Sequence, residues 1–381
     1  MKIIKSEVLR WQAVTQLPEP YLPAWEAPSG APRSTLNLSI YRLTTDSGIA
    51  GIGPYTGGSP ELVLGMDPCD VGRFWARHMS GVRSSTSGKG ASGLEIALWD
   101  ILGKAAGEPI HRLLGSRQDR LPVYAATSRL LGVEEMVADA LLLKDMGFRA
   151  IKVRLHRPGV DDDLAVVRAV RAALDDDIKL MADANQNNYS DGYAYWPRET
   201  ALAVAREMDA LGCYFLEEPL PRSDVRGLAE IAASVDMYIA GGEHTPTVHD
   251  WQPYLRERAY DILQPDLVMG GNLGITGARK ISAWAEAHGR LVIPHVLMSG
   301  AAFPLCLSAS LHAMATVDNC PMVEYPYDPP ILTEATTQAC FAKPLAIDAD
   351  GCVALPTGPG LGVELAPGLL AEAEIESVLT A

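Results

Sequence analysis

The stretch AIKVRLH, residues 150–156, is a short apolar run interrupted by cationic side chains. Successive side chains of a strand alternate between its two faces, so Lys152 and Arg154 point the same way. His156 follows just past the predicted strand end. Because the chain has a net charge of −15, an acidic ligand would need local cations of this kind to attract it.

Seven further stretches of the same texture alternate with helical segments from Leu121 onward. In chain order, the eight predicted strands are LPVYAATS, AIKVRL, IKLMADAN, CYFLEEP, YIAGGEH, DILQPDL, RLVIPHV and MVEYP. Short apolar strands separated by helices predict a parallel sheet with right-handed crossovers, and eight repeats favour a closed (β/α)8 barrel. The last repeat is short and irregular.

The sequence on either side of this region has a different texture. Residues 1–119 contain longer strand-like runs and a helical stretch, which predicts an α+β domain. We assign residues 120–328 to the barrel and residues 329–381 to a C-terminal segment. In that segment, AIDADGCVAL predicts a hairpin around Asp350 that we expect to return to the first domain.

Composition restricts the possible partners and the compartment. A net charge of −15, a pI near 5.0 and the lack of any Lys/Arg-rich tract argue against nucleic-acid or anionic-membrane binding. The six cysteines are widely separated, which favours reduced thiols. The sequence shows neither the apolar core of a signal peptide nor an apolar run of about 18 residues. We therefore expect a cytoplasmic protein.

Polar residues occupy the ends of the predicted strands. From the second strand to the eighth they are Lys152 with Arg154, Asp183, Glu217, Glu243, Asp266, His295 and Glu324. The carboxyl ends of all barrel strands meet at one face, where barrel enzymes place their chemistry. The sequence therefore predicts that these side chains converge on one pocket.

Three of these residues are carboxylates on consecutive strands, Asp183, Glu217 and Glu243. Each one alone is explained as well by an Asx turn, a helix entry or a loop. Their recurrence in phase with the strands favours an all-oxygen site for a hard divalent cation, with Mg²⁺ as the leading candidate and one ion per chain.

Asp266 and His295 stand on the next two strands. A lone histidine in this setting is more often structural. An imidazole beside a carboxylate is held in one tautomer and becomes a better base, so the pair favours general acid/base catalysis near neutral pH.

The succession K-x-R, DANQ, EEP, GGEH, QPDL, IPH and VEYP resembles the enolase superfamily, and the Asp–His pair resembles its mandelate racemase subgroup. ALWDILGKAAGEPIHRLLG, residues 97–115, is similar to the last helix of that family's capping domain. PTGPGLGVEL, residues 356–365, is similar to its C-terminal segment. The resemblance implies a modified (β/α)8 TIM barrel under an α+β cap built from both ends of the chain.

The resemblance also implies roles for the strand-end residues. Asp183, Glu217 and Glu243 would hold Mg²⁺, which stabilises the enediolate formed when a proton α to a carboxylate is removed. Lys152 matches a lysine that touches the substrate carboxylate. Glu324 matches a position that hydrogen-bonds a substrate carboxylate oxygen, and for that it would have to be protonated or share a proton.

The chain departs from the commonest family pattern, K-x-K, at Arg154. Arginine keeps its proton, with a pKa above about 12, so Arg154 is a poor base and a better anion clamp. His295 would then act alone, on one face of the substrate. A single histidine can remove the α-proton and protonate a departing β-hydroxide, which predicts a lyase that dehydrates a sugar acid to a 2-keto-3-deoxy acid.

Other activities stay open at this point. A cycloisomerase acting on an acid-sugar lactone would use the same residues with a different leaving group. A racemase or epimerase would need a second base. A protein that binds a metal or a sugar acid without catalysis is a more remote alternative.

Substrate selection is expected to lie in the loops of the cap. Residues 20–34 and 53–61 are rich in Pro and Gly and carry Trp25 and Tyr55, although ordinary surface connections would look the same. We assign substrate contacts to four residues, Asn185, His244, Trp25 and Tyr55. The segment 187–197 extends the mouth or contacts another subunit of an expected homo-oligomer.

Overall fold

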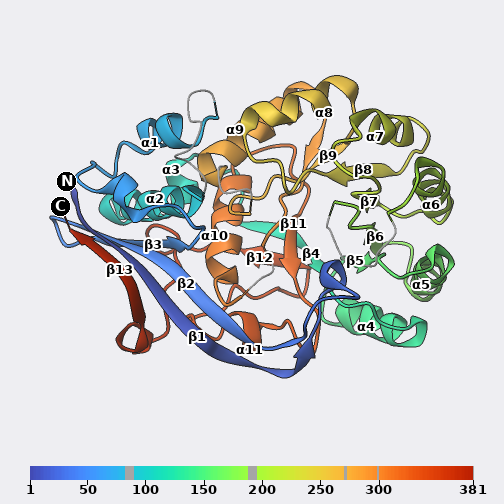
Figure 1. The fold of residues 1–381 in the computed structure, drawn as a ribbon, viewed down its shortest axis with the longest axis horizontal. Helices are drawn as coiled ribbons and strands as arrows, with labels where there is room; N and C mark the ends of the chain where they lie inside the picture. The colour runs from blue at the N-terminus through green and yellow to red at the C-terminus, as the bar shows by residue number, and fades with distance from the viewer. Residues whose placement is uncertain (82–89, 188–194, 270–272, 298–299, 381) are drawn as a thin grey trace.

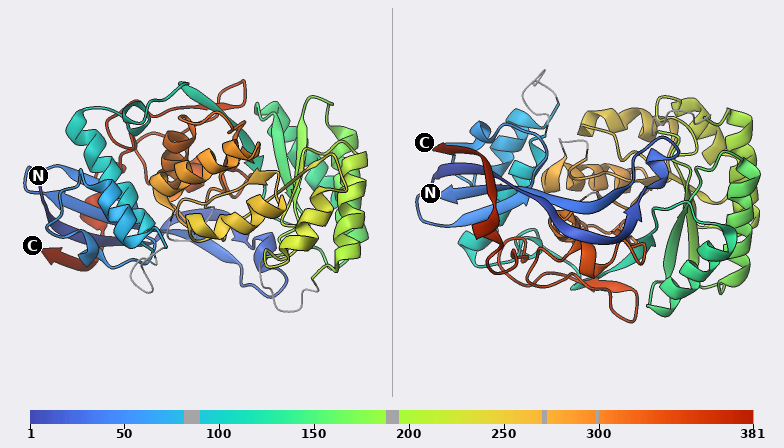
Figure 2. Two further views of the ribbon diagram at one scale, coloured as in Figure 1. Left: turned by 90° about the horizontal axis from the view of Figure 1, so that it is seen from above. Right: turned by 60° about the horizontal axis from the view of Figure 1, so that its bottom comes forward.

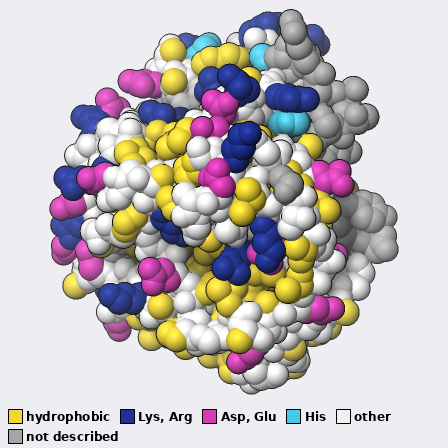
Figure 3. Space-filling view, turned by 90° about the vertical axis from the view of Figure 1, so that its left-hand side faces the viewer, with side chains coloured by type: hydrophobic (Ala, Val, Ile, Leu, Met, Phe, Trp, Pro, Cys, Tyr) yellow, Lys and Arg dark blue, Asp and Glu magenta, His cyan; other side chains and the backbone are white. Residues whose placement is uncertain are grey.

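The computed structural model describes residues 1–81, 90–187, 195–269, 273–297 and 300–380. An antiparallel sheet with helices lies at the end of the molecule that carries both termini, and a barrel-like body lies at the other end (Figure 1). On the side that carries the termini, acidic and basic side chains are interspersed with hydrophobic ones (Figure 3). Among the described residues, no helix has the length and hydrophobicity needed to cross a membrane.

The barrel-like body is a curled sheet of parallel strands in the order β10-β9-β8-β7-β6-β5-β4-β11. The strands are β4 (Arg120–Ala126), β5 (Ala150–Arg154), β6 (Lys179–Asp183), β7 (Phe215–Glu217), β8 (Tyr238–Gly241), β9 (Ile262–Leu263), β10 (Leu291–Val292) and β11 (Val323–Pro326). Each of these strands lies within one of the eight predicted stretches or overlaps it. The predicted modified (β/α)8 barrel is confirmed as the fold class.

Helices cover the outside of this sheet between successive strands. They are α4 (Val133–Asp145), α5 (Val160–Ala173), α6 (Arg198–Ala210), α7 (Val225–Ala232), α8 (Gln252–Glu257), α9 (Gly274–Ala287) and α10 (Phe303–Met314). Because the helices cover the outer face of the strands, the side chains that point outward from them are largely apolar. The short helix α11 (Glu334–Thr337) follows β11, which agrees with the irregular last repeat.

The capping domain is a four-stranded antiparallel sheet in the order β13-β1-β2-β3. Its strands are β1 (Ile3–Tyr21), β2 (Arg33–Thr45), β3 (Ala50–Pro54) and β13 (Glu374–Thr380). The helices α1 (Val71–His78), α2 (Ser92–Ala106) and α3 (Ile110–Leu113) belong to the same half of the molecule. Since β13 pairs with β1, both ends of the chain build the cap, as predicted.

The far ends of the long strands β1 and β2 reach the barrel (Figure 2). The segment that joins them contains a short 3-10 helix, η1 (Ala24–Glu26). The amide of Ala24 donates to the carbonyl oxygen of Ser128, which follows β4, at 2.7 Å. The connection between β1 and β2 together with Arg33, the first residue of β2, is called the lid below (residues 22–33).

The prediction that the Asp350 hairpin packs on the first domain was wrong. The hairpin forms, with the amide of Gly351 donating to Asp348 O at 3.1 Å, but its second strand, β12 (Cys352–Ala354), pairs with β4 of the barrel. β12 pairs with Arg120–Pro122, whereas β11 pairs with β4 from Val123 onward. β12 therefore satisfies backbone groups of β4 that β11 does not reach.

Candidate active site

Strand periodicity aims the polar residues into the barrel. Its interior contains an apolar cluster with contributions from every strand or its flanks: Tyr124, Ala126, Ala150, Met181, Phe215, Ala240, Ile262, Ile293 and Met322. Two residues after five of these positions, on the same face of the chain, come Lys152, Asp183, Glu217, His295 and Glu324. The apolar cluster therefore lies in the barrel directly beneath the polar site.

Lys152 lies at the centre of the polar site and is fully buried. Its Nζ lies 2.6 Å from Glu217 Oε2 and 2.8 Å from Glu324 Oε1. Burial by itself lowers the pKa of Lys152, but the charges of Glu217 and Glu324 outweigh it and raise the pKa above its usual value. Lys152 is consequently a permanent cation in this arrangement and a poor base.

Arg154 joins the metal-ligand candidates to the lid. Its guanidinium forms an ion pair with Asp183 Oδ2, and its Nε donates to Thr127 O at 2.7 Å. The guanidinium carbon lies 5.0 Å from the centre of the Trp25 ring in the lid. Although burial opposes it, the nearby charge of Asp183 raises the pKa of Arg154, which keeps this side chain protonated.

His295 forms the predicted pair with Asp266. Its Nδ1 lies 2.6 Å from Asp266 Oδ2, and its Nε2 lies 3.2 Å from Glu243 Oε2. Burial alone lowers the pKa of His295, but Glu243, Glu324 and Asp266 together raise it well above the usual value. The imidazole is therefore held in position through Nδ1, while Nε2 faces the site.

The three carboxylates proposed for Mg²⁺ differ in what they contact. Asp183 pairs with Arg154 and accepts from the Asn185 amide at 2.8 Å, and Glu243 contacts both His295 and His244. Within the described ranges, no three His, Cys, Asp or Glu side chains form a ready-made metal site. The three carboxylates are instead neutralised by the protein's own cations.

The chemistry of this set still fits a hard cation. Burial raises the pKa of Glu217 to about 7, and the charge of Asp183 adds to this effect. Glu217 Oε1 is buried and accepts no hydrogen bond from the described part of the chain. Oxygen ligands with excess negative charge and an unused acceptor are what Mg²⁺ favours.

Glu324 lies between Lys152 and the backbone that follows β10. Glu324 Oε1 accepts from Lys152 and Oε2 accepts from the amide of Val296 at 2.8 Å. Burial by itself raises the pKa of Glu324, but the charges of Lys152, His295 and Arg154 lower it below its usual value. Glu324 is therefore an ionised acceptor in this arrangement.

Glu218 is a site residue that sequence reasoning passed over. It is fully buried, has a φ of 46°, and its Oε1 accepts from Asn187 Nδ2 at 2.6 Å. Burial raises its pKa well above the usual value, and the charges of Glu243 and Asp183 add to the effect. The doubled glutamate in EEP was the available signal, and only the first glutamate was assigned.

A cavity of about 410 Å³, the mouth cavity, opens above these residues. Its lining includes six predicted residues and four that were not predicted. The predicted ones are Trp25, Arg154, Asn185, Glu243, His244 and His295, and the others are Glu26, Arg33, Met269 and Leu297.

Tyr55 does not line the mouth cavity. It lines a neighbouring cavity of about 320 Å³, and its ring lies 4.6 Å from the guanidinium carbon of Arg10. His156 is buried, and burial together with the charge of Arg154 lowers its pKa to about 4. Of the segment 187–197, residues 188–194 lie outside the described residues.

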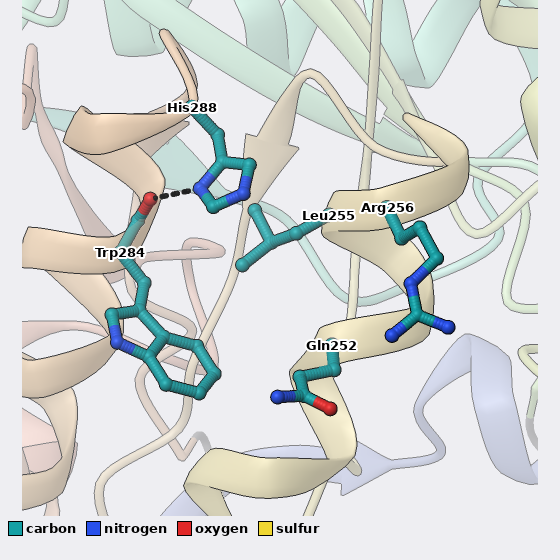
Figure 4. Close-up of a pocket in the computed structure, with 5 residues that line it drawn as sticks. All are labelled: Gln252, Leu255, Arg256, Trp284 and His288. Atoms are coloured by element: carbon teal, nitrogen blue, oxygen red, sulfur yellow. Dashed lines mark hydrogen bonds between the residues drawn. The ribbon is translucent and has the colours of Figure 1, made fainter.

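A separate pocket lies outside the barrel between α8 and α9 (Figure 4). It has a volume of about 280 Å³ and is lined by Gln252, Leu255, Arg256, Trp284 and His288. None of the predicted site residues lines it, so we place the chemistry in the mouth cavity.

A capped, modified barrel with three carboxylates and an Asp–His pair at its strand ends defines a protein of the enolase superfamily. Within it, the chain belongs to the mandelate racemase/muconate lactonizing enzyme family. Residues 23–115 match the N-terminal domain of that family, and residues 135–369 match the enolase C-terminal domain-like region.

Similar proteins include dehydratases, cycloisomerases and an epimerase. The chain is 33% identical over 257 residues to L-talarate/galactarate dehydratase of Salmonella typhimurium, a match that covers 64% of this chain and 62% of that enzyme. It is 32% identical over 323 residues to D-galactarolactone cycloisomerase of Agrobacterium fabrum, which covers 81% of each chain. L-Talarate dehydratase from Polaromonas sp. JS666, solved with Mg and L-glucarate, aligns with a TM-score of 0.80 and 26% identity over 100% of this chain and 99% of that one.

Proposed function

We propose that this protein is a Mg²⁺-dependent lyase that removes water from a sugar acid and yields a 2-keto-3-deoxy acid. The observation that carries the proposal is the position of His295, whose Nδ1 is held by Asp266 while Nε2 faces the carboxylate cluster. Lys152 and Arg154 start from much higher pKa values than an imidazole, and the surrounding carboxylates raise those values further, so both are poorer bases than His295. His295 is therefore the one candidate base, and it would act on one face of the substrate.

Asp183, Glu217 and Glu243 are the residues that would hold the metal ion. Bound Mg²⁺ would supply positive charge against the second negative charge that develops on the substrate carboxylate as the α-proton leaves. For these carboxylates to serve as ligands, Asp183 has to exchange part of its contact with Arg154 for the cation.

The protein's own groups account for the proton steps. His295 Nε2 takes the α-proton, and Asp266 stabilises the resulting imidazolium through Nδ1. The electrons of the broken C–H bond form the C=C bond as the β C–O bond breaks. The imidazolium returns its proton to the departing hydroxide, which leaves as water, and the enol rearranges to the 2-keto acid. Lys152 contributes a fixed positive charge near the substrate carboxylate.

A cycloisomerase that opens or rearranges an acid-sugar lactone is the second candidate. The match to a cycloisomerase over 81% of each chain favours keeping it. The same base and the same carboxylates would serve, with a lactone oxygen as the leaving group. Racemisation or epimerisation would need a second base, and a non-catalytic binding protein would not need the Asp266–His295 pair. A homo-oligomeric assembly and a cytoplasmic location stay predictions.

The test is incubation of the purified protein with Mg²⁺ and a panel of acid sugars and their lactones. Formation of 2-keto acids is followed chemically, and exchange of the α-proton is followed by NMR in heavy water. A 2-keto-3-deoxy product formed from an open-chain acid with loss of water supports the dehydratase. A 2-keto-3-deoxy product formed from a lactone by ring opening, without loss of water, supports the cycloisomerase. Stereochemical inversion at the α-carbon without loss of water would contradict both.

A further inference from the structure

The mouth cavity has a second charged end, formed by the lid. Glu26, the last residue of η1, forms an ion pair with Arg33, the first residue of β2. Both side chains keep 36% of their surface exposed, whereas Arg154 and Glu243, which line the cavity on the barrel side, its floor, are buried. The cavity therefore runs from a closed, charged floor to a partly open, charged lid.

Arg33 also faces the neighbouring cavity of about 320 Å³. Arg33 and Leu297 line both cavities, so the two cavities lie on either side of this pair. The neighbouring cavity is otherwise lined by neutral residues, including Thr35, Asn37 and Tyr55. Among the described residues that line it, Arg33 is the only charged one.

The two ends differ in the balance of their charges. At the floor, the cations Lys152 and Arg154 are surrounded by Asp183, Glu217 and Glu324. At the lid, Arg33 has one carboxylate partner, Glu26, and a guanidinium carries five N–H donors. In a protein with a net charge of −15, an anionic group far from the reacting carbon needs such a cation.

We propose that Arg33 binds a second anionic group at the far end of the substrate, so that the enzyme prefers sugar acids with a carboxylate at both ends. This inference rests on the proposed function, because it places the reacting carboxylate at the floor beside Lys152. The planar guanidinium matches a carboxylate with two parallel hydrogen bonds. Glu26 serves as the counter-ion of Arg33 when no second carboxylate is present, and it opposes the second carboxylate when one is.

The test compares two substrates that differ only at the far end, such as galactarate and galactonate. For the wild type, kcat/KM is expected to be higher for the diacid. Arg33→Met keeps the length of the side chain and removes its charge. It should lower kcat/KM for the diacid by about 10- to 100-fold, mainly through KM, as expected for the loss of a charged hydrogen bond. The monoacid should change by less than about threefold.

Arg42→Met is the matched control. Arg42 lies on the same strand, keeps 35% of its side chain exposed and pairs with Glu7 at 4.0 Å, but it does not line either cavity. Its replacement should leave the preference for the diacid unchanged. If Arg42→Met lowered kcat/KM for the diacid as much as Arg33→Met does, the effect would come from any change in β2, and the proposed role of Arg33 would be overturned.

Glu26→Gln provides a change in the opposite direction. Removing the competing negative charge should raise kcat/KM for the diacid by about two- to fivefold, the range for a partly exposed ion pair. Opposite effects of the two lid variants cannot come from general damage to the lid. Equal losses on both substrates in Arg33→Met, or a wild-type preference for the monoacid, would overturn the inference while leaving the dehydratase proposal intact.

Calorimetric binding separates this inference from the proposed function. Galactarate and galactonate are titrated into the Mg²⁺-loaded wild type and Arg33→Met. A preference for the diacid that disappears in Arg33→Met supports the role of Arg33 even if neither compound is turned over, a result that would count against the dehydratase. Equal affinities of the wild type for the two acids would overturn the inference regardless of turnover.

Discussion

The floor and the lid of the mouth cavity hold their charges in different ways. Beneath the barrel side of the cavity, Lys152 and Glu217 are fully buried on barrel strands, with Lys152 Nζ 2.6 Å from Glu217 Oε2. At the lid, Glu26 ends the short helix η1 and Arg33 begins β2, and both keep about a third of their surface exposed. Residues on rigid strands suit the chemical step, whereas loop residues suit the selection of a substrate. Changes at the floor should therefore affect kcat, and changes at the lid should affect KM.

Removal of the metal ion should produce the largest loss of activity, because it affects the floor alone. Protein treated with a chelator is expected to lose dehydration and α-proton exchange completely, and added Mg²⁺ should restore both, because the floor then lacks the charge that offsets the developing dianion. Turnover and exchange are measured before and after adding Mg²⁺. Full activity in excess chelator would contradict the assignment of Asp183, Glu217 and Glu243.

Replacement of the proposed base should come next. His295→Asn keeps roughly the shape of the side chain but cannot take a proton, so kcat should fall by about 10³-fold or more. His288→Asn is the control, since His288 is exposed on the outside of the barrel. α-Proton exchange is measured for both variants. Exchange that persists in His295→Asn would identify a second base, and racemisation or epimerisation would become the leading activity.

Arg154→Lys should have a smaller effect at the floor. Lysine keeps the charge but loses the planar contact with Asp183 and Trp25, so kcat at saturating Mg²⁺ should fall by about 10-fold. Arg168→Lys, at an exposed ion pair on α5, is the control. Faster α-proton exchange in Arg154→Lys than in the wild type would indicate that the new lysine acts as a base on the second face.

Replacement of Trp25 in the lid should give the smallest effect of this series. Trp25→Leu removes the ring that lies 5.0 Å from Arg154, and KM should rise about threefold with little change in kcat, which matches the loss of a cation–π contact. Trp25→Phe, which keeps an aromatic ring, should restore most of the affinity. Steady-state kinetics on one acid sugar measure both values. A large fall in kcat in Trp25→Leu would show that floor and lid do not act separately.

Most of the residues at the barrel end of the site could be predicted from the sequence. The strands are short apolar runs, and a side chain two positions after an apolar interior residue points into the same barrel. Lys152, Asp183, Glu217, His295 and Glu324 were predicted from their positions at the ends of consecutive strands and from the convergence of parallel strands, and the structure shows that each follows an apolar interior residue by two positions. Glu218 was missed because the rule sends alternate residues outward. Its backbone φ of 46° is not foreseen by the rule, and its buried side chain interacts with the charges of Glu243 and Asp183 beside the site.

The sequence by itself determined the barrel, the cap and the residues at the strand ends, because strand periodicity and the alternation with helices are local properties. Only the tertiary structure decided which charges meet. Lys152 and Glu324 are 172 positions apart, and their contact makes Glu324 an ionised acceptor. Tertiary packing likewise determines that β12 pairs with β4 and that Arg33 lines the mouth cavity. Such contacts depend on how distant segments pack, and no local pattern records that packing.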